Sequence, residues 1–296
     1  MVEHQFGGPW TEEKLNRLRK YLPAYTKIFT SNPRAAYFHT LYVDAFAGTG
    51  FRQDEAVDRE EEGALFDVNV DPEAGAFRQG SAAIALETTP PFAEYVFIER
   101  SATYVQSLAR LRESFPALAP HITVVSDDAN VYLRRWCSNT DWHRNRAVVF
   151  LYPYGMQVQW ATIAAMAATP GIDLWILFPL GIGVNRLLLR ERLPQGPWAD
   201  RLTALFGTEA WQQAFYRPSE QQNLFGDQPE TIRDADFARI AQFWLERLRT
   251  VFPHVAPQPL PLRNSRHVPL YLLCFAASNP RKGSTAVRIA QHILSR

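Results

Sequence analysis

Short apolar runs alternate along residues 80–181 with segments whose apolar residues recur at helical spacing. Runs such as "EYVFIE" at 94–99 are typical of strands that lie buried between layers of helices. This alternation predicts an α/β fold with a doubly wound, mostly parallel, Rossmann-like sheet. The expected strands cover residues 38–48, 94–99, 121–128, 146–155 and 172–181, and the expected helices cover residues 80–88, 101–115, 129–137 and 160–169.

The segment before the first strand is expected to be a helix over residues 9–29, with an apolar stripe that packs on the core. Pro23 lies inside it, so a kink or a division of the helix is expected there. The stripe consists of Leu15, Leu18, Leu22, Tyr25 and Phe29.

Two segments depart from the alternating pattern. Residues 51–79 are acidic and contain turn signals, which indicates an insertion loop that is either solvated or a functional lid. Residues 186–255 are mostly helical in pattern and rich in tryptophan, and we interpret them as a helical insertion or subdomain. A strand at 269–279 and a helix at 283–295 then return to the sheet, so residues 1–296 are predicted to form a single domain.

Composition and charge narrow the class of protein only in part. The chain has 296 residues, of which 47% are hydrophobic, and this suffices for a full core. The net charge of +1 neither favours nor excludes nucleic acid. Cys137 and Cys274 are isolated and the histidines lack ligand spacing, so no metal site is expected. Without a recognisable signal peptide or membrane-length apolar run, the protein is expected to be cytoplasmic and to have no membrane partner.

Acidic residues and glycines follow the expected strands in chain order. Ligands of doubly wound sheets bind at the carboxyl ends of strands, so the residues at these positions are candidates for a binding site. Each of them alone would also suit an ordinary turn. They are Asp44, Ala45, Phe46, Gly48 and Gly50 after the first strand, Glu99 at the end of the second, Asp127 and Asp128 after the third, Tyr152, Pro153 and Tyr154 after the fourth, and Gly181 and Gly183 after the fifth.

These residue types in this order indicate an adenosine-containing cofactor. Glu99 would accept hydrogen bonds from the ribose hydroxyls, and Asp127 or Asp128 would accept one from the adenine amino group. A nicotinamide dinucleotide is disfavoured because the glycine turn lacks the third glycine of G-x-G-x-x-G. S-adenosylmethionine fits better, since Asp44 can attract a sulfonium centre or an ammonium group.

Several motifs together resemble the family of three-Cys-motif partner proteins, TcmP. They are "FGGPWTEEKL" with "YLPAY", "DAFAGTG", "GSA", "FIE", "LYPYG", "FPLGIGVNRLL" and the late "YLLCFAASN". The resemblance covers most of the chain. It implies a class I, S-adenosylmethionine-dependent methyltransferase type of fold. We expect Asp44, Gly48 and Gly50 to hold the methionine part of the cofactor, and Ala45 and Phe46 to belong to the same cofactor site. It also implies a partner with a three-cysteine motif that is similar to radical-SAM enzymes.

The chain departs from the family at the residue before "PYG". The family favours an acid there, and amino-methyltransferases place Asp or Asn before Pro and an aromatic residue. Tyr152 occupies that position in this chain, and a phenol with a pKa of about 10 is neutral at pH 7. Tyr152, Pro153 and Tyr154 are therefore candidates for the acceptor side. Two hypotheses stay open: methyl transfer to a changed acceptor, and a non-catalytic partner subunit that retains the fold.

Cations and aromatic residues gather in two further places and suggest nucleic acid as a partner. Amphipathic helix faces with arginine stems packed on rings would give the same pattern. The first group contains Arg134, Arg135, Trp136, Trp142, His143, Arg144 and Arg146, and the second contains Arg263, Arg266, His267, Arg281, Lys282 and Arg288.

Overall fold

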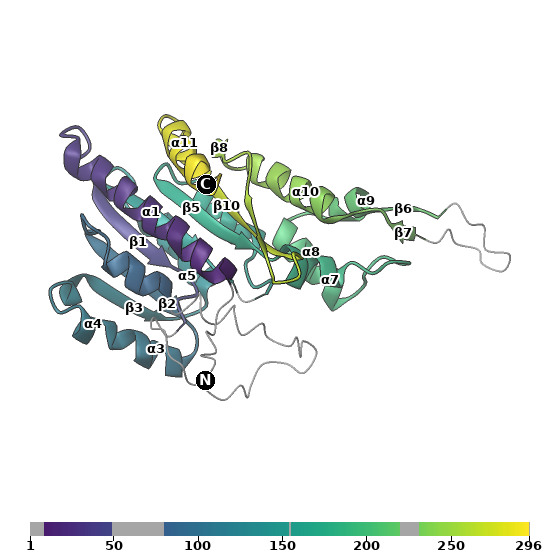
Figure 1. Cartoon of the computed structure of the whole chain (residues 1–296), viewed down its shortest axis with the longest axis horizontal. Helices are drawn as coiled ribbons and strands as arrows, with labels where there is room; N and C mark the ends of the chain where they lie inside the picture. Colours follow the sequence, from purple (N-terminus) through teal and green to yellow (C-terminus); the bar gives the residue numbers. More distant parts are fainter. Residues whose placement is uncertain (1–8, 49–79, 154, 220–230, 296) are drawn as a thin grey trace. The chain divides into compact units, whose positions relative to one another are not determined.

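The computed structural model describes residues 9–48, 80–153, 155–219 and 231–295 (Figure 1). The chain divides into two compact units. The first covers Met1–Ala129 and the second covers Asn130–Arg296.

The first unit is built on parallel strands in the order β3-β2-β1. The inner residues of β1 and β2 are apolar and buried, which is why these short runs form strands between helices. Strand β3 ends the strand order, and only its first residue is buried. Its elements are α1 (Pro9–Ser31), β1 (His39–Asp44), a helix at residues 80–86, β2 (Glu94–Glu99), α3 (Ala102–Ala109), α4 (Leu111–Ser114), the short 3-10 turn η1 (Ala119–His121) and β3 (Ile122–Ser126).

Helix α1 packs on this sheet through its aromatic and leucine stripe. The ring of Tyr25 stacks on Phe92 at 5.7 Å between centroids, and Phe92 lies 5.7 Å from Tyr42 of β1. The predicted stripe is confirmed, with Leu22 fully buried. The predicted division of the helix is wrong, because α1 continues through Pro23. Buried side chains on both sides of the proline offset the loss of one backbone hydrogen bond.

The predicted helix at 101–115 is instead two short helices. The N–H of Arg110 bonds to Ser107 three residues back, which tightens the chain and ends α3. Arg112 of α4 then donates to the carbonyl oxygen of Ile122 at 2.7 Å from one guanidinium nitrogen and 3.2 Å from another. This contact holds α4 beside the first residue of β3.

The second unit contains β4 parallel to β5, and β10 antiparallel to β5. All residues of β10 are buried, which confirms that the chain returns to the sheet late in the sequence. Strands β8 and β9 pair with opposite ends of β10. The elements are α5 (Ala129–Asn139), β4 (Asn145–Leu151), α6 (Trp160–Ala167), β5 (Ile172–Phe178), the π-helical turn η2 (Leu180–Val184), α7 (Asn185–Leu187), α8 (Pro197–Phe206), α9 (Trp211–Phe215), β6 (Tyr216–Pro218), β7 (Thr231–Arg233), α10 (Phe237–Arg249), β8 (His254–Val255), β9 (Leu260–Arg263), β10 (Pro269–Ala277) and α11 (Gly283–Leu294).

The region predicted as a helical insertion contains α8, α9 and α10, and also the unpredicted antiparallel pair β6–β7, which runs out beyond α9 (Figure 1). Asp236 caps α10 by accepting the N–H of Arg239 at 2.8 Å. Inside the unit, Trp244 of α10 stacks on Phe178 of β5 at 4.4 Å between ring centroids. Burial of this amphipathic face fixes α10 against the sheet.

These strands and helices confirm the predicted fold class: the chain has a Rossmann-like α/β fold with mostly parallel strands. The single-domain assignment and the insertion boundaries stay predictions, and residues 51–79 lie outside the described part of the chain. None of the helices in the described residues is both long enough and apolar enough to span a bilayer.

Both cysteines are free thiols in the interior. Burial raises the pKa of Cys137 to about 12, and it raises that of Cys274 to about 12 as well. Since only the thiolate is nucleophilic, both thiols would be almost entirely protonated and unreactive at pH 8. We expect very slow reaction with a disulfide reagent such as DTNB in the native protein and full reaction of both thiols after denaturation. A thiol that titrates rapidly in the native protein would contradict this burial.

Candidate cofactor-binding site

The carboxyl ends of the strands in the first unit bring three of the predicted acids to one edge. In the register of the parallel strands, Asp44 lies opposite Phe97, and Glu99 lies opposite Ser126. Asp127 directly follows Ser126, so it leaves β3 beside the end of β2. The edge therefore carries Asp44, Glu99 and Asp127 in the order of the strands.

Glu99 joins the end of β2 to the glycine turn after β1. Its Oε2 accepts the N–H of Gly48 at 3.0 Å, and its Oε1 accepts the N–H groups of Arg100 at 2.9 Å and Ser101 at 3.0 Å. Gly48 has a φ of +61°, which a residue with a side chain rarely adopts. Glu99 thus holds the turn close to the first residues of the α3 segment, with its carboxylate half-buried.

Asp44 lies deeper than the other acids, with 1% of its surface exposed. Its Oδ2 accepts a hydrogen bond from the Ser81 hydroxyl at 2.7 Å and from the Tyr42 hydroxyl at 3.4 Å. Burial, and then the negative charge of Asp44, raise the pKa of Tyr42 well above its ordinary value. Asp44 therefore ties the end of β1 to the first turn of the helix at 80–86.

The remaining predicted cofactor residues surround this edge. Ala45 is fully buried and Phe46 is half-buried, on the path from β1 to Gly48. Asp127 and Asp128 are half-exposed, and Asp127 Oδ1 accepts the N–H of Asp128 at 2.8 Å. Gly50 lies outside the described residues.

The predicted acceptor residues belong to the second unit. Tyr152 and Pro153 directly follow β4, and both are buried. Tyr152 is 3% exposed, and its ring lies 5.9 Å from that of Tyr271 in β10. Tyr154 lies outside the described residues. The phenol of Tyr152 is therefore a packed group at the end of β4.

Asn130 was not among the predicted site residues, although it lies in the "SDDAN" stretch. It is 5% exposed and lies in the first turn of α5. Its Nδ2 donates to the carbonyl oxygen of Gln157 at 2.9 Å, and its Oδ1 accepts from the Gln159 N–H and the Thr162 hydroxyl, both at 2.9 Å. Asn130 thereby fixes the loop that follows Tyr152 and Pro153. A polar residue next to an apolar helix face was the only signal for it.

Part of the first predicted group of cations and aromatic residues lies at the amino edge of the second unit. Trp142, Arg144 and Arg146 are near the amino end of β4, away from Tyr152. There the rings of Trp136 and Trp142 pack edge to face at 5.1 Å, and Arg146 donates to the carbonyl oxygen of Trp142. This packing gives Trp136, Trp142 and Arg146 of the first group a structural role.

The second group is itself divided by the direction of β10. Arg263, Arg266 and His267 belong to the turn between β9 and β10, at the carboxyl edge of β5, because Leu272 pairs with Phe178. Arg281 and Lys282 follow the other end of β10, where Ala277 pairs with Asp173 near the start of β5. Only the first three thus share the edge on which Tyr152 lies.

Within the described residues, no group of three or more His, Cys, Asp and Glu side chains could hold a metal ion.

Comparisons with known proteins identify the fold and no family. No family model matches the sequence, and no curated protein matches it either. Among solved structures, protein LPL1258 from Legionella pneumophila, described with the family model DUF519, aligns over 99% of this chain and 93% of its own at 13% identity and a TM-score of 0.52. At that identity the likeness supports the α/β fold alone.

Two further structures are more distant. The Escherichia coli protein yhhF, whose assignment as a methyltransferase is provisional, aligns over 73% of this chain and 86% of its own at 14% identity, with a TM-score of 0.29. A Bordetella parapertussis protein aligns over 90% of this chain and 67% of its own at 11% identity, with a TM-score of 0.36. Neither adds an argument about function, and the resemblance to TcmP stays a prediction.

Proposed function

We propose that the chain binds S-adenosylmethionine at the strand ends of its first unit and transfers the methyl group to an acceptor. One observation carries the proposal: the Glu99 carboxylate, at the end of β2, holds the Gly48 turn at the end of β1. An acid and a glycine turn placed together in this way suit a nucleoside whose ribose lies against the backbone.

The two oxygens of Glu99 differ in what they can still accept. A carboxylate oxygen offers about two lone-pair positions. Oε1 already accepts two backbone N–H groups, whereas Oε2 accepts one, from Gly48. Among the described contacts, Oε2 of Glu99 can therefore accept a further hydrogen bond from a ribose hydroxyl. Glu99 would contact the cofactor through this oxygen.

The other two acids suit the remaining parts of the same molecule. Asp127 is half-exposed beside the end of β2, where its carboxylate can accept from an adenine amino group. Asp44 is buried and hydrogen-bonded to Ser81, so it is less suited than Glu99 or Asp127 to direct contact with the cofactor. Its negative charge in a buried environment would instead attract the sulfonium or ammonium group through space.

S-adenosylmethionine supplies an electrophilic methyl group on a positive sulfur. The protein then has mainly to position the acceptor in line and to exclude water, and such positioning can account for most of the rate. Tyr152 and Pro153 are our candidates for the acceptor side. A buried, neutral phenol can orient a substrate group by a hydrogen bond, but it does not supply a resting carboxylate.

Calorimetric titration with S-adenosylmethionine tests the proposal. We expect Glu99→Gln to weaken binding roughly 10- to 100-fold, because the ribose hydroxyl would no longer bond to a charged acceptor. Glu94→Gln is the matched control: Glu94 begins the same strand, is exposed, and lies 3.1 Å from His39 at the opposite end. It should leave the affinity unchanged.

Equal affinities in the native protein and both variants would remove Glu99 from the site, and the absence of binding in the native protein would remove the cofactor assignment. Because Glu99 also receives the N–H groups at the start of the α3 segment, thermal melting of each variant should accompany the titration. A folded Glu99→Gln protein with weakened binding supports the proposal.

A second candidate function is favoured by the burial of Tyr152. If this packed phenol does not serve an acceptor, the chain would be a non-catalytic partner that retains the fold, and a three-cysteine-motif protein is the partner that the resemblance to TcmP implies. A labelled-methyl assay separates the two functions. Transfer that Glu99→Gln abolishes would exclude the partner-only function, whereas cofactor binding without transfer to RNA, DNA or protein would favour it.

A further inference from the structure

The turn between β9 and β10 lies against the glycine turn that follows β5. A Cβ atom on Gly181 would come within 2.1 Å of the carbonyl oxygen of Pro269, the first residue of β10. Backbone therefore meets backbone at this point. The β9–β10 turn and the segment from Gly181 to α7 are held together at the carboxyl edge of β5. Tyr152, directly after β4, lies at the same edge of the parallel β4–β5 pair.

Hydrogen bonds give the β9–β10 turn a defined shape. Asn264 Oδ1 accepts the N–H groups of Arg266 and Val268, both at 3.0 Å, and the backbone of Asn264 pairs with that of Val268. Arg263 donates to the carbonyl oxygen of His267 at 2.9 Å. His267 has a φ of +58°, so the chain reverses sharply there. The exposed side chains of the turn are thus presented on an ordered backbone.

The segment that forms this turn carries positive charge and no acidic residues. Residues 251–296 contain no Asp or Glu, although the whole chain has 30 of them against 31 Lys and Arg. Arg263 and Arg266 are exposed, and so is Arg186, which lies in α7 directly after η2. Within the described part of the chain, none of these three arginines forms a salt bridge with a carboxylate.

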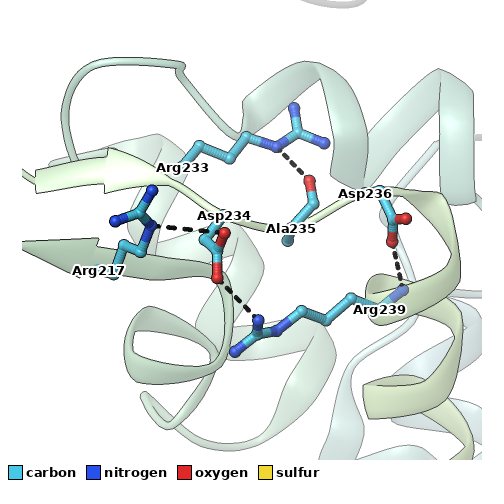
Figure 2. A network of polar contacts seen from close by, with 6 residues as sticks. All are labelled: Arg217, Arg233, Asp234, Ala235, Asp236 and Arg239. Atoms are coloured by element: carbon cyan, nitrogen blue, oxygen red, sulfur yellow. Dashed lines mark hydrogen bonds and ion pairs between the residues drawn. The ribbon is translucent and has the colours of Figure 1, made fainter.

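The arginines around the β6–β7 pair behave differently. Figure 2 shows Asp234 between two of them, with its oxygens 3.5 Å from Arg217 Nε and 2.9 Å from an Arg239 guanidinium nitrogen. Arg233 instead bonds to the backbone: its guanidinium group donates to the carbonyl oxygen of Ala235 (Figure 2) and to those of Asn185 and Leu188 at either end of α7. These cations stabilise the structure through contacts within the chain. Arg233 in particular holds α7, and with it the backbone that carries Arg186.

We propose that Arg186, Arg263 and Arg266 bind the phosphate backbone of a nucleic acid that presents the methyl acceptor. Guanidinium groups bind phosphate oxygens through two parallel N–H bonds, and exposed arginines that form no salt bridge in the described part of the chain suit a polymer with repeated negative charge. The surface shares an edge with Tyr152, where the acceptor would be held. In assigning the acceptor class, this inference rests on the proposed function. The binding of nucleic acid itself does not depend on it.

Fluorescence anisotropy with labelled single-stranded RNA, single-stranded DNA and duplex DNA, at several salt concentrations, tests the inference on the full chain. The triple variant Arg186→Gln, Arg263→Gln, Arg266→Gln should bind about tenfold or more weakly, and the slope of log affinity against log salt should fall by about one for each phosphate that is no longer neutralised. The matched control is Arg281→Gln, Lys282→Gln, Arg288→Gln. It removes the same charge from exposed positions of the acid-free segment 251–296, beyond the other end of β10.

Weaker binding in the first variant and unchanged binding in the control supports the inference, and the probe that binds tightest identifies RNA or DNA. Equal weakening in both variants would show non-specific attraction and would overturn the inference. Absence of binding to every probe would overturn it as well. Calorimetry with S-adenosylmethionine on the same proteins is read separately. Absence of cofactor binding in the native chain would reject the proposed function, whereas cofactor binding without nucleic-acid binding would reject only this surface.

Discussion

Replacing Gly207 by alanine is expected to lower the free energy of unfolding by about 3 to 5 kcal/mol, through backbone strain and overpacking together. Gly207 ends α8 in the left-handed conformation with a φ of +67°. A Cβ atom there would lie 2.0 Å from Cδ1 and 2.1 Å from Cγ of Trp160. The indole would have to move. It also lies under the Arg247 guanidinium at 4.4 Å and against Trp244 at 6.1 Å, so the displacement would reach the core of the second unit.

Gly196→Ala is the control for the strain at Gly207. Gly196 precedes α8 with a φ of +57°, but a Cβ atom there would meet nothing within 4 Å. It measures the cost of a positive φ without a steric contact, on the order of 1 to 3 kcal/mol, although its ψ of −137° differs from the 22° of Gly207. Urea denaturation of the three proteins gives the comparison. Similar destabilisation of the two variants would mean that Trp160 yields easily, and that the close packing around it contributes little to stability.

The sequence was sufficient to predict strands β1 to β5 and β10 and the residues at their ends. Parallel strands buried on both faces leave a strong apolar signal, and β1 to β5 lie where these runs predicted them. The direction of parallel strands then places every carboxyl end of one layer at the same edge. For this reason Asp44, Glu99 and Asp127 could be assigned to one edge from the order of the strands alone.

The contacts that shape the site could not be predicted, because they join residues far apart in the chain. The bond from Ser81 to Asp44 and that from Gly48 to Glu99 depend on the register between strands and helices. The burial of Tyr152 likewise depends on Tyr271, which a late antiparallel strand brings beside it. Local pattern carries no information about such partners, so it predicted the residues without predicting their exposure.

The β6–β7 pair was missed for a different reason. Each strand has only three residues, too few to show an alternating pattern, and the surrounding helices dominate the local periodicity. The split between α3 and α4 was missed in the same way, since apolar spacing continues across it while one tightened turn interrupts the helix.

Replacing Asn130 by leucine is expected to lower the free energy of unfolding by about 3 kcal/mol or more, because buried polar groups would be left without their partner. The carbonyl of Gln157, the N–H of Gln159 and the hydroxyl of Thr162 all bond to this one side chain. Leucine has the same branched shape and number of heavy atoms but is larger, so no cavity is left, and the destabilisation would reflect the lost hydrogen bonds together with some overpacking. The loop after Tyr152 should loosen, and the amide of Gln159 should exchange with deuterium much faster.

Thr162→Val is the matched control for Asn130→Leu. It removes one of the three hydrogen bonds and leaves Asn130 Oδ1 bonded to the Gln159 N–H, so it should cost about 0.5 to 1.5 kcal/mol. Protection of the Gln159 amide should survive in this variant. If the leucine variant kept that protection as well, the backbone alone would hold the loop. Asn130 would then stabilise α5 without positioning the segment that follows β4, and it would have no connection to the acceptor side.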